Sequence, residues 1–260
     1  MRFPAVLILS IGASLVACGS RDGDAGSKPN PNSIGTGVHI RDVVDPAKNM
    51  NGATVSISGA VVLTIDTYDE TQDGKSRGTV YVQDIGSQAP FSGTSLYSPA
   101  FVPSDLRVVP GDTLDLLGQY VTESSIGAAV FNPGEVLPQI SKPTATFRYE
   151  FKTPDPVQID VGDLNDNNYA TGYQWENMLV TVKNVVLCDG LSTSKGRTTG
   201  ALATDCTNAA GSATMSNELM PLDVNAYAPG TKVASLTGIV TWFFSYHIAP
   251  RTADDIVIAQ

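Results

Sequence analysis

The same order of strand and turn patterns occurs twice in this chain, in two stretches of roughly 100 residues each. Each stretch has two long runs in which apolar and polar residues alternate, and a Pro-Gly turn precedes the second run. Such alternation is typical of β-strands with one buried face. The long runs lie at 54–65, 113–123, 178–188 and 232–244, and the shorter predicted strands at 78–84, 91–97, 128–131, 211–217, 222–226, 246–251 and 255–258. The repetition predicts two β domains of one kind, at 37–145 and 146–260.

Each domain fits a small closed barrel. Three of the long runs contain a glycine (Gly59, Gly118 and Gly238), and glycine inside a strand marks the sharp bends that small barrels need. Lys, Glu and Leu are scarce, whereas Val, Thr, Ile and Tyr are frequent, which favours strands over helices. Five strands in a small closed sheet indicate an OB-fold barrel. A β-sandwich with similar strand spacing is the alternative.

The N-terminus predicts export. Residues 1–17 carry one charge, Arg2, followed by an apolar run ending in small residues, which is typical of a signal peptide. The run of about 15 residues is shorter than the ~20 of a spanning helix. Leu15-Val16-Ala17-Cys18 resembles the lipobox of bacterial lipoproteins. The resemblance implies that Cys18 carries acyl chains such as palmitate and becomes the new N-terminus. An ordinary secretory signal that leaves Cys18 as a free thiol is the alternative.

A flexible linker follows the proposed anchor. Residues 18–36 are rich in Gly, Ser, Pro, Asn and Asp and hold one large aliphatic residue, Ile34. Such a segment buries too little surface to offset its ordering entropy. Gly19-Ser20 lacks the acidic second residue that retains members of this lipoprotein family in the inner membrane. The resemblance therefore implies a lipid anchor in the outer membrane.

Charge and cysteine content limit the partners. The chain has 16 Lys and Arg against 26 Asp and Glu, for a net charge of −10. This acidity makes nucleic acid an unlikely partner, because binding to it needs basic patches. Once Cys18 is assigned to the anchor, Cys188 and Cys206 remain, and an even number in an exported chain indicates a disulfide. Two free thiols, or a zinc site that lacks a nearby histidine pair, are the alternatives.

Two segments of the second stretch carry a family resemblance. The run Trp175–Val186 resembles the first strand of OB-fold modules in bacterial extracellular and lipid-anchored proteins, and the run Leu236–Ile256 resembles their ending. Similar modules accompany the catalytic domains of secreted nucleases. The sequence contains no such catalytic domain.

Few residues suggest chemistry. His39 and His247 are the only histidines, neither lies at metal-binding spacing from another ligand, and no phosphate loop, HExxH or GxSxG motif is present. We therefore expect no cofactor and no catalytic set. We expect Arg251 to pair locally with Asp254 or Asp255. A weak calcium candidate is the loop with the oxygen-bearing residues Asp160, Asp163, Asn165 and Asp166.

An aromatic run is the other candidate site. Because side chains alternate along a strand, part of the set Trp242, Phe243, Phe244 and Tyr246 must face outward or be covered by the other domain. We expect Trp242, Phe244 and Tyr246 to form a face that binds a ligand or a partner. The sequence favours a non-enzymatic, lipid-anchored component of an envelope complex that binds other envelope proteins. The alternatives are a polysaccharide- or nucleic-acid-binding module and an enzyme or its accessory subunit; a histidine beside carboxylates in a polar pocket would indicate an enzyme.

Overall fold

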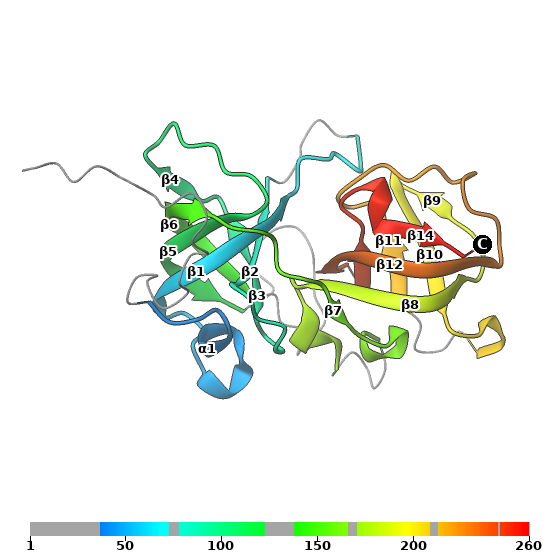
Figure 1. Cartoon of the computed structure of the whole chain (residues 1–260), viewed down its shortest axis with the longest axis horizontal. Coiled ribbons are helices and arrows are strands. Elements are labelled where there is room, and N and C mark those ends of the chain that lie inside the picture. Colours follow the sequence, from blue (N-terminus) through cyan, green and yellow to red (C-terminus); the bar gives the residue numbers. More distant parts are fainter. Residues whose placement is uncertain are drawn as a thin grey trace, which may run out of the picture.

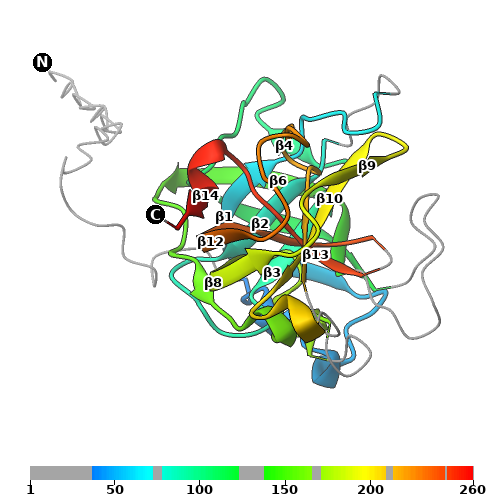
Figure 2. The same ribbon diagram turned by 90° about the vertical axis from the view of Figure 1, so that its right-hand side faces the viewer.

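The computed structural model describes residues 37–72, 78–122, 138–165, 171–208, 213–243 and 245–259. They form two β-barrels side by side, which we call barrel 1 (37–150) and barrel 2 (157–259) (Figure 1). Figure 2 views the molecule from the side of barrel 2. Among the described residues, no helix is both long and apolar enough to cross a bilayer.

Barrel 1 closes through five strands. β1 pairs with β2 and β5, β3 pairs with β2 and β6, and β5 pairs with β6, while β4 extends the pairing along β6. The elements are α1 (Arg41–Val44), η2 (Pro46–Lys48), β1 (Thr54–Ile65), β2 (Val80–Asp84), β3 (Gly93–Tyr97), β4 (Ala100–Val102), β5 (Asp112–Val121) and β6 (Gln139–Glu150).

Barrel 2 repeats this connectivity. β8 pairs with β10 and β12, β11 pairs with β10 and β13, and β12 pairs with β13, with β7, β9 and β14 added at the edges. The elements are β7 (Val157–Gln158), η3 (Val161–Asp163), η4 (Gly172–Trp175), β8 (Leu179–Leu187), β9 (Ser192–Ser194), β10 (Arg197–Ala203), η5 (Cys206–Asn208), β11 (Ala213–Ser216), β12 (Thr231–Trp242), β13 (Tyr246–Ala249), η6 (Ala253–Asp255) and β14 (Ile256–Ile258).

The prediction of an all-β chain with two OB-like barrels is therefore confirmed. In the closed sheet of each barrel the third and fifth strands run parallel and the other neighbouring strands antiparallel; the added strands β4 and β7 also pair in parallel. This strand order closes the sheet on itself, which two separate sheets of a sandwich would not do. Each barrel has its own apolar core, which includes Ile57, Val62, Leu96, Leu114 and Ile140 in barrel 1 and Val180, Leu187, Leu202, Met215 and Ile248 in barrel 2.

Two predicted strands need correction. The strand that closes barrel 1 is β6, which the sequence reasoning missed; the segment 128–131, expected in that role, lies outside the described residues. β6 contains Pro143, which argues against a strand, but the pairing register shifts there and Gly118 of β5 leaves room opposite the proline ring. The expected boundary at 145 falls within β6. Residues 222–226 form a turn in which Ala226 N donates to Asp223 O.

Candidate functional site: the junction between the barrels

The faces that OB folds use for ligands are the first place to look for a site. Ligands of this fold bind on the outer face of the second and third strands and on the adjoining loops. In barrel 1 these strands are β2 and β3, and their outward residues pair directly, Tyr81 with Ser95 and Gln83 with Gly93. Gln83 is fully buried and Ser95 nearly so, although both point out of the barrel. Another part of the protein must therefore cover this face.

The cover is the segment of barrel 2 that leads into β8. Phe91 N donates to Gln174 O at 2.8 Å, and Leu179 N donates to Gln83 Oε1 at 3.0 Å. At Gly93 an added Cβ would lie 2.7 Å from the backbone of Asn177, so only glycine allows this approach. The two barrels are thus joined by backbone hydrogen bonds and close packing across the ligand face of barrel 1.

A small apolar cluster lies in the same junction. Leu63 of barrel 1 packs with Leu179 and Ile239 of barrel 2, and each is at most 1% exposed. Tyr81 and Leu219 cover this cluster. Its members come from both barrels, so separating the barrels would expose large apolar side chains to water.

An ionic cluster closes the junction at the loops. We use the term junction cluster for Glu70, Arg197, Glu218, Thr241 and His247. The guanidinium of Arg197, at the start of β10, donates to Glu70 Oε1 of barrel 1 at 2.8 Å and to Glu218 Oε1 at 3.0 Å. The side chains of Arg197, Glu70 and Glu218 are only 13%, 7% and 13% exposed.

Neighbouring groups fix the geometry of the cluster. The Thr241 hydroxyl donates to the second carboxylate oxygen of Glu218. The Arg197 guanidinium stacks on the Phe243 ring, 3.8 Å from its centroid. Gly196, with φ of +83°, places the chain so close to barrel 1 that a Cβ would lie 2.8 Å from Glu70 O. One arginine therefore ties a loop of barrel 1 to the β10 end of barrel 2.

His247 lies beside Glu218 in the junction cluster. Its Nδ1 is 3.9 Å from Glu218 Oε1 and the residue is 5% exposed. Burial lowers the pKa of His247; the Glu218 carboxylate opposes this shift and the Arg197 guanidinium adds to it. The imidazole is therefore neutral at pH 7. A histidine beside a carboxylate was the feature that would indicate an enzyme, but here Arg197 and Thr241 already bind that carboxylate within a buried cluster.

A second polar contact joins the barrels near α1. The hydroxyls of Tyr120 in barrel 1 and Tyr173 in barrel 2 both donate to Val44 O, at 3.4 and 3.3 Å. Burial raises the pKa of Tyr173 to about 12 and raises that of Tyr120 further. Both phenols therefore stay protonated and act as donors.

Asp84 anchors the start of barrel 1. Its carboxylate accepts hydrogen bonds from Ile40 N at 2.6 Å and Arg41 N at 3.1 Å, and the exposed His39 lies 3.7 Å away. Burial raises the pKa of Asp84 to about 6, against the lowering effect of these two amides and of His39. The site holds the segment that follows the linker onto barrel 1.

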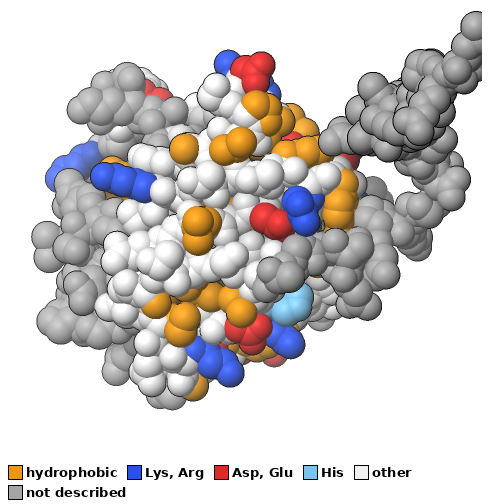
Figure 3. Space-filling view, turned by 90° about the vertical axis from the view of Figure 1, so that its left-hand side faces the viewer, with side chains coloured by type: hydrophobic (Ala, Val, Ile, Leu, Met, Phe, Trp, Pro, Cys, Tyr) orange, Lys and Arg blue, Asp and Glu red, His pale blue; other side chains and the backbone are white. Residues whose placement is uncertain are grey.

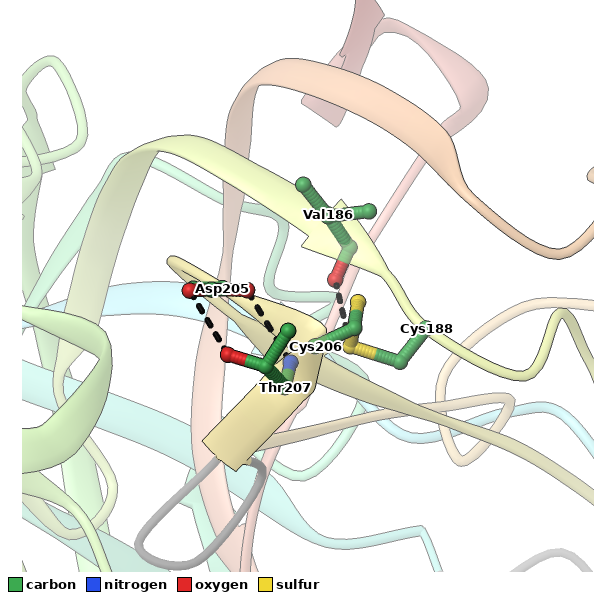
Figure 4. Close-up of a disulfide and its surroundings, with 5 residues drawn as sticks. All are labelled: Val186, Cys188, Asp205, Cys206 and Thr207. Atoms are coloured by element: carbon green, nitrogen blue, oxygen red, sulfur yellow. Dashed lines mark hydrogen bonds between the residues drawn. A yellow bond between two sulfur atoms is a disulfide. The ribbon is translucent and has the colours of Figure 1, made fainter.

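The predicted disulfide between Cys188 and Cys206 is present (Figure 4). It links the end of β8 to η5, where the Asp205 carboxylate accepts hydrogen bonds from the amide and hydroxyl of Thr207. The bond closes the loop that contains β9 and β10. The predicted local pair of Arg251 is also confirmed, since Arg251 binds Asp255 through two nitrogens at 2.9 and 3.0 Å.

The predicted aromatic face is not an open face. Tyr246 is 3% exposed and belongs to the core of barrel 2, and Trp242 packs edge-on against it. Both side chains point inward because they occupy paired inner positions on β12 and β13. Phe243 points the other way, onto Arg197. Phe244 lies outside the described residues.

The described residues of the calcium candidate form hydrogen bonds with backbone groups. Asp160 and Asp163 form a reciprocal capping box at η3, and the Asn165 amide binds both Tyr246 N and Tyr246 O. No group of three or more His, Cys, Asp or Glu side chains arranged to hold a metal occurs in the described part of the chain. Asp166 and Cys18 both lie outside it.

The sequence did not predict that Glu70, Arg197 and Glu218 form ion pairs with one another. Arg197 stands in a run of Ser, Thr, Lys and Gly, and Glu218 in a run of Asn and Met, so neither position carries a motif. A basic residue is rare in this acidic chain, and that rarity was the only signal in the sequence. The partners become visible only when the barrels are placed side by side.

Comparisons with known proteins place the chain in no family. No family model matches it, and no curated protein matches it. Among solved structures, a murine DNA-binding protein bound to double-stranded DNA aligns over 79% of this chain and 97% of its own, at 9% identity and a TM-score of 0.31. A likeness at that score carries no argument about this chain.

Proposed function

We propose that this protein is a non-enzymatic, lipid-anchored envelope protein that serves as a binding or assembly component of an outer-membrane complex. The proposal combines the lipobox-like sequence at Cys18 and the flexible linker with the two joined barrels. In it, the lipid holds the protein at the membrane, and the barrels present a fixed outer surface to other envelope proteins.

The observation that carries the proposal is that the ligand face of barrel 1 is covered by barrel 2. In barrel 1 the outer face of β2 and β3 lies under residues 174–179 of barrel 2. In barrel 2 the start of β10 is held by Glu70 of barrel 1. A polysaccharide or nucleic acid bound to barrel 1 would need the face that barrel 2 covers, and the net charge of −10 also disfavours nucleic acid. The polymer-binding alternative therefore has less support than the assembly role.

The outer surface supports contact with proteins rather than with one buried ligand. Figure 3 shows the side of barrel 1 that faces away from barrel 2, where apolar side chains form small separate patches among polar and some charged ones. Leu117 on β5 and Val102 on β4 are 56% and 50% exposed. Apolar side chains scattered in this way are ordinary on a protein surface and do not force association, so they are compatible with a limited contact with a partner.

The test compares the wild type with Cys18→Ala in the native cell. We expect the wild type to incorporate labelled palmitate, to remain with outer membranes after an alkaline wash, and to cross-link to specific envelope proteins. The Cys18→Ala variant should lose the label, become soluble and cross-link to fewer partners. A wild type without label would contradict the anchor. A labelled, membrane-bound wild type that cross-links to no protein more than a lipidated unrelated domain does would contradict the assembly role.

A further inference from the structure

The two histidines of the chain differ in their surroundings. The side chain of His39 is 55% exposed, whereas that of His247 is 6% exposed within the junction cluster. His247 Nδ1 has no hydrogen-bond partner, although it lies 3.9 Å from Glu218 Oε1. A buried ring nitrogen without a hydrogen-bond partner is uncommon. When it lies at an interface, a change in the protonation of that histidine can change the stability of the interface.

The charges around His247 are those of the junction itself. In the described part of the chain, Glu218 from the segment after β11 and Arg197 from β10 face the imidazole, and Glu70 from the loop after β1 lies on the far side of Arg197. Arg197 is shared by the two carboxylates, one from each barrel. A new positive charge on His247 would attract Glu218 and repel Arg197, which is the group that holds barrel 1.

We propose that the junction cluster is a pH-sensitive latch between the two barrels, with His247 as the group that takes up the proton. The latch is closed when the imidazole is neutral, because the buried ring then needs no counter-charge and leaves Glu218 to Arg197. When the junction opens, the imidazole meets water and regains an ordinary proton affinity. Protons therefore favour the open form.

The pH dependence of latch opening follows from the difference in proton binding between the closed and open forms. The pKa of His247 in the closed form is lowered from 6.5, chiefly by burial. A group with a lowered pKa in the closed form binds fewer protons there, so closure is fully favoured above the ordinary value and weakens as the pH falls below it. For one proton, the opening constant rises by at most about tenfold between pH 7.5 and 5.5.

Two amides report opening directly. Phe91 N donates across the junction to Gln174 O, and Leu179 N donates across it to Gln83 Oε1. The measurement is hydrogen exchange at these amides in the full lipid-bearing protein in detergent, read by mass spectrometry as protection factors between pH 5.5 and 7.5. Protection factors remove the intrinsic pH dependence of exchange.

We expect the protection of both amides in the wild type to fall over this range, by up to about tenfold. His247→Gln keeps a polar side chain that cannot titrate. In this variant the protection of the two amides should therefore be independent of pH. His39→Gln is the matched control and should behave like the wild type. An equal fall in the wild type and His247→Gln would overturn the latch, as would a flat profile in the wild type.

If His247→Gln does not fold, the wild type alone still decides. The ring signal of His247, followed by nuclear magnetic resonance, should then stay that of a neutral imidazole near pH 6.5, where the two amides begin to lose protection, because the closed form dominates and lowers the pKa of this ring. A His247 ring that titrates with an ordinary imidazole pKa in the closed protein would exclude the latch.

Discussion

Replacing Arg197 with methionine removes the cation that joins Glu70 of barrel 1 to Glu218 of barrel 2. Methionine keeps an unbranched apolar stem against Phe243 but has no donor for Glu70 or Glu218. These two carboxylates are 7% and 13% exposed, so the variant would leave two like charges buried without a cation between them. Breaking a buried ion pair in this way costs about 3–5 kcal/mol of unfolding free energy.

The assay is urea unfolding of the exported chain with Cys18→Ala, followed by tryptophan fluorescence. Lys152→Met is the matched control, because Lys152 pairs with Asp155 at 3.1 Å on an open surface where the two side chains are 68% and 74% exposed. It should leave the stability unchanged. The triple variant Arg197→Met, Glu70→Gln, Glu218→Gln should recover most of the loss, since it buries no charge. A loss below about 1 kcal/mol for Arg197→Met, or no recovery in the triple variant, would refute the reasoning.

Three further changes test other contacts. Gly93→Ala adds a Cβ 2.7 Å from Asn177, and we expect a loss of about 1–3 kcal/mol by thermal unfolding; an unchanged melting temperature would mean that the barrels do not touch there. Cys188→Ser with Cys206→Ser should cost roughly 3 kcal/mol in urea unfolding, from the loop of sequence separation 18, and no loss would show the loop to be ordered without the bond. Since the pKa of Asp84 is raised from 3.8 to about 6, the folded chain binds the proton of the Asp84 carboxyl group more tightly than the unfolded chain does. Unfolding free energy should therefore fall as the pH rises from 4 to 6, and Asp84→Asn should lack this slope; identical slopes would disprove the assignment.

The sequence predicted the strands best where alternation was long. β1, β8 and β12 lie close to their predicted ranges because one buried face enforces a period of two. β6 was missed because Lys142 and Pro143 interrupt its pattern, and their tolerance depends on the register shift opposite Gly118. That shift is a tertiary feature that a single sequence does not encode locally.

The candidate site was predictable only in part. The disulfide and the Arg251–Asp255 pair followed from counting and from short separation in the chain. The junction cluster did not, because Glu70 and Arg197 are 127 residues apart and meet only through the packing of two barrels. The aromatic run was misassigned because alternation shows that Trp242 and Phe243 lie on opposite faces of the strand, but does not show which of the two faces the core of the barrel.

The central claim is that barrel 2 covers the ligand face of barrel 1, so that the two barrels move as one body. The most direct measurement is a set of residual dipolar couplings from backbone amides of both barrels in the Cys18→Ala protein at pH 7.5. A single alignment tensor should then fit the couplings of residues 37–150 and 157–259 together. Two tensors of clearly different magnitude would show independent barrels with accessible ligand faces and would contradict the claim.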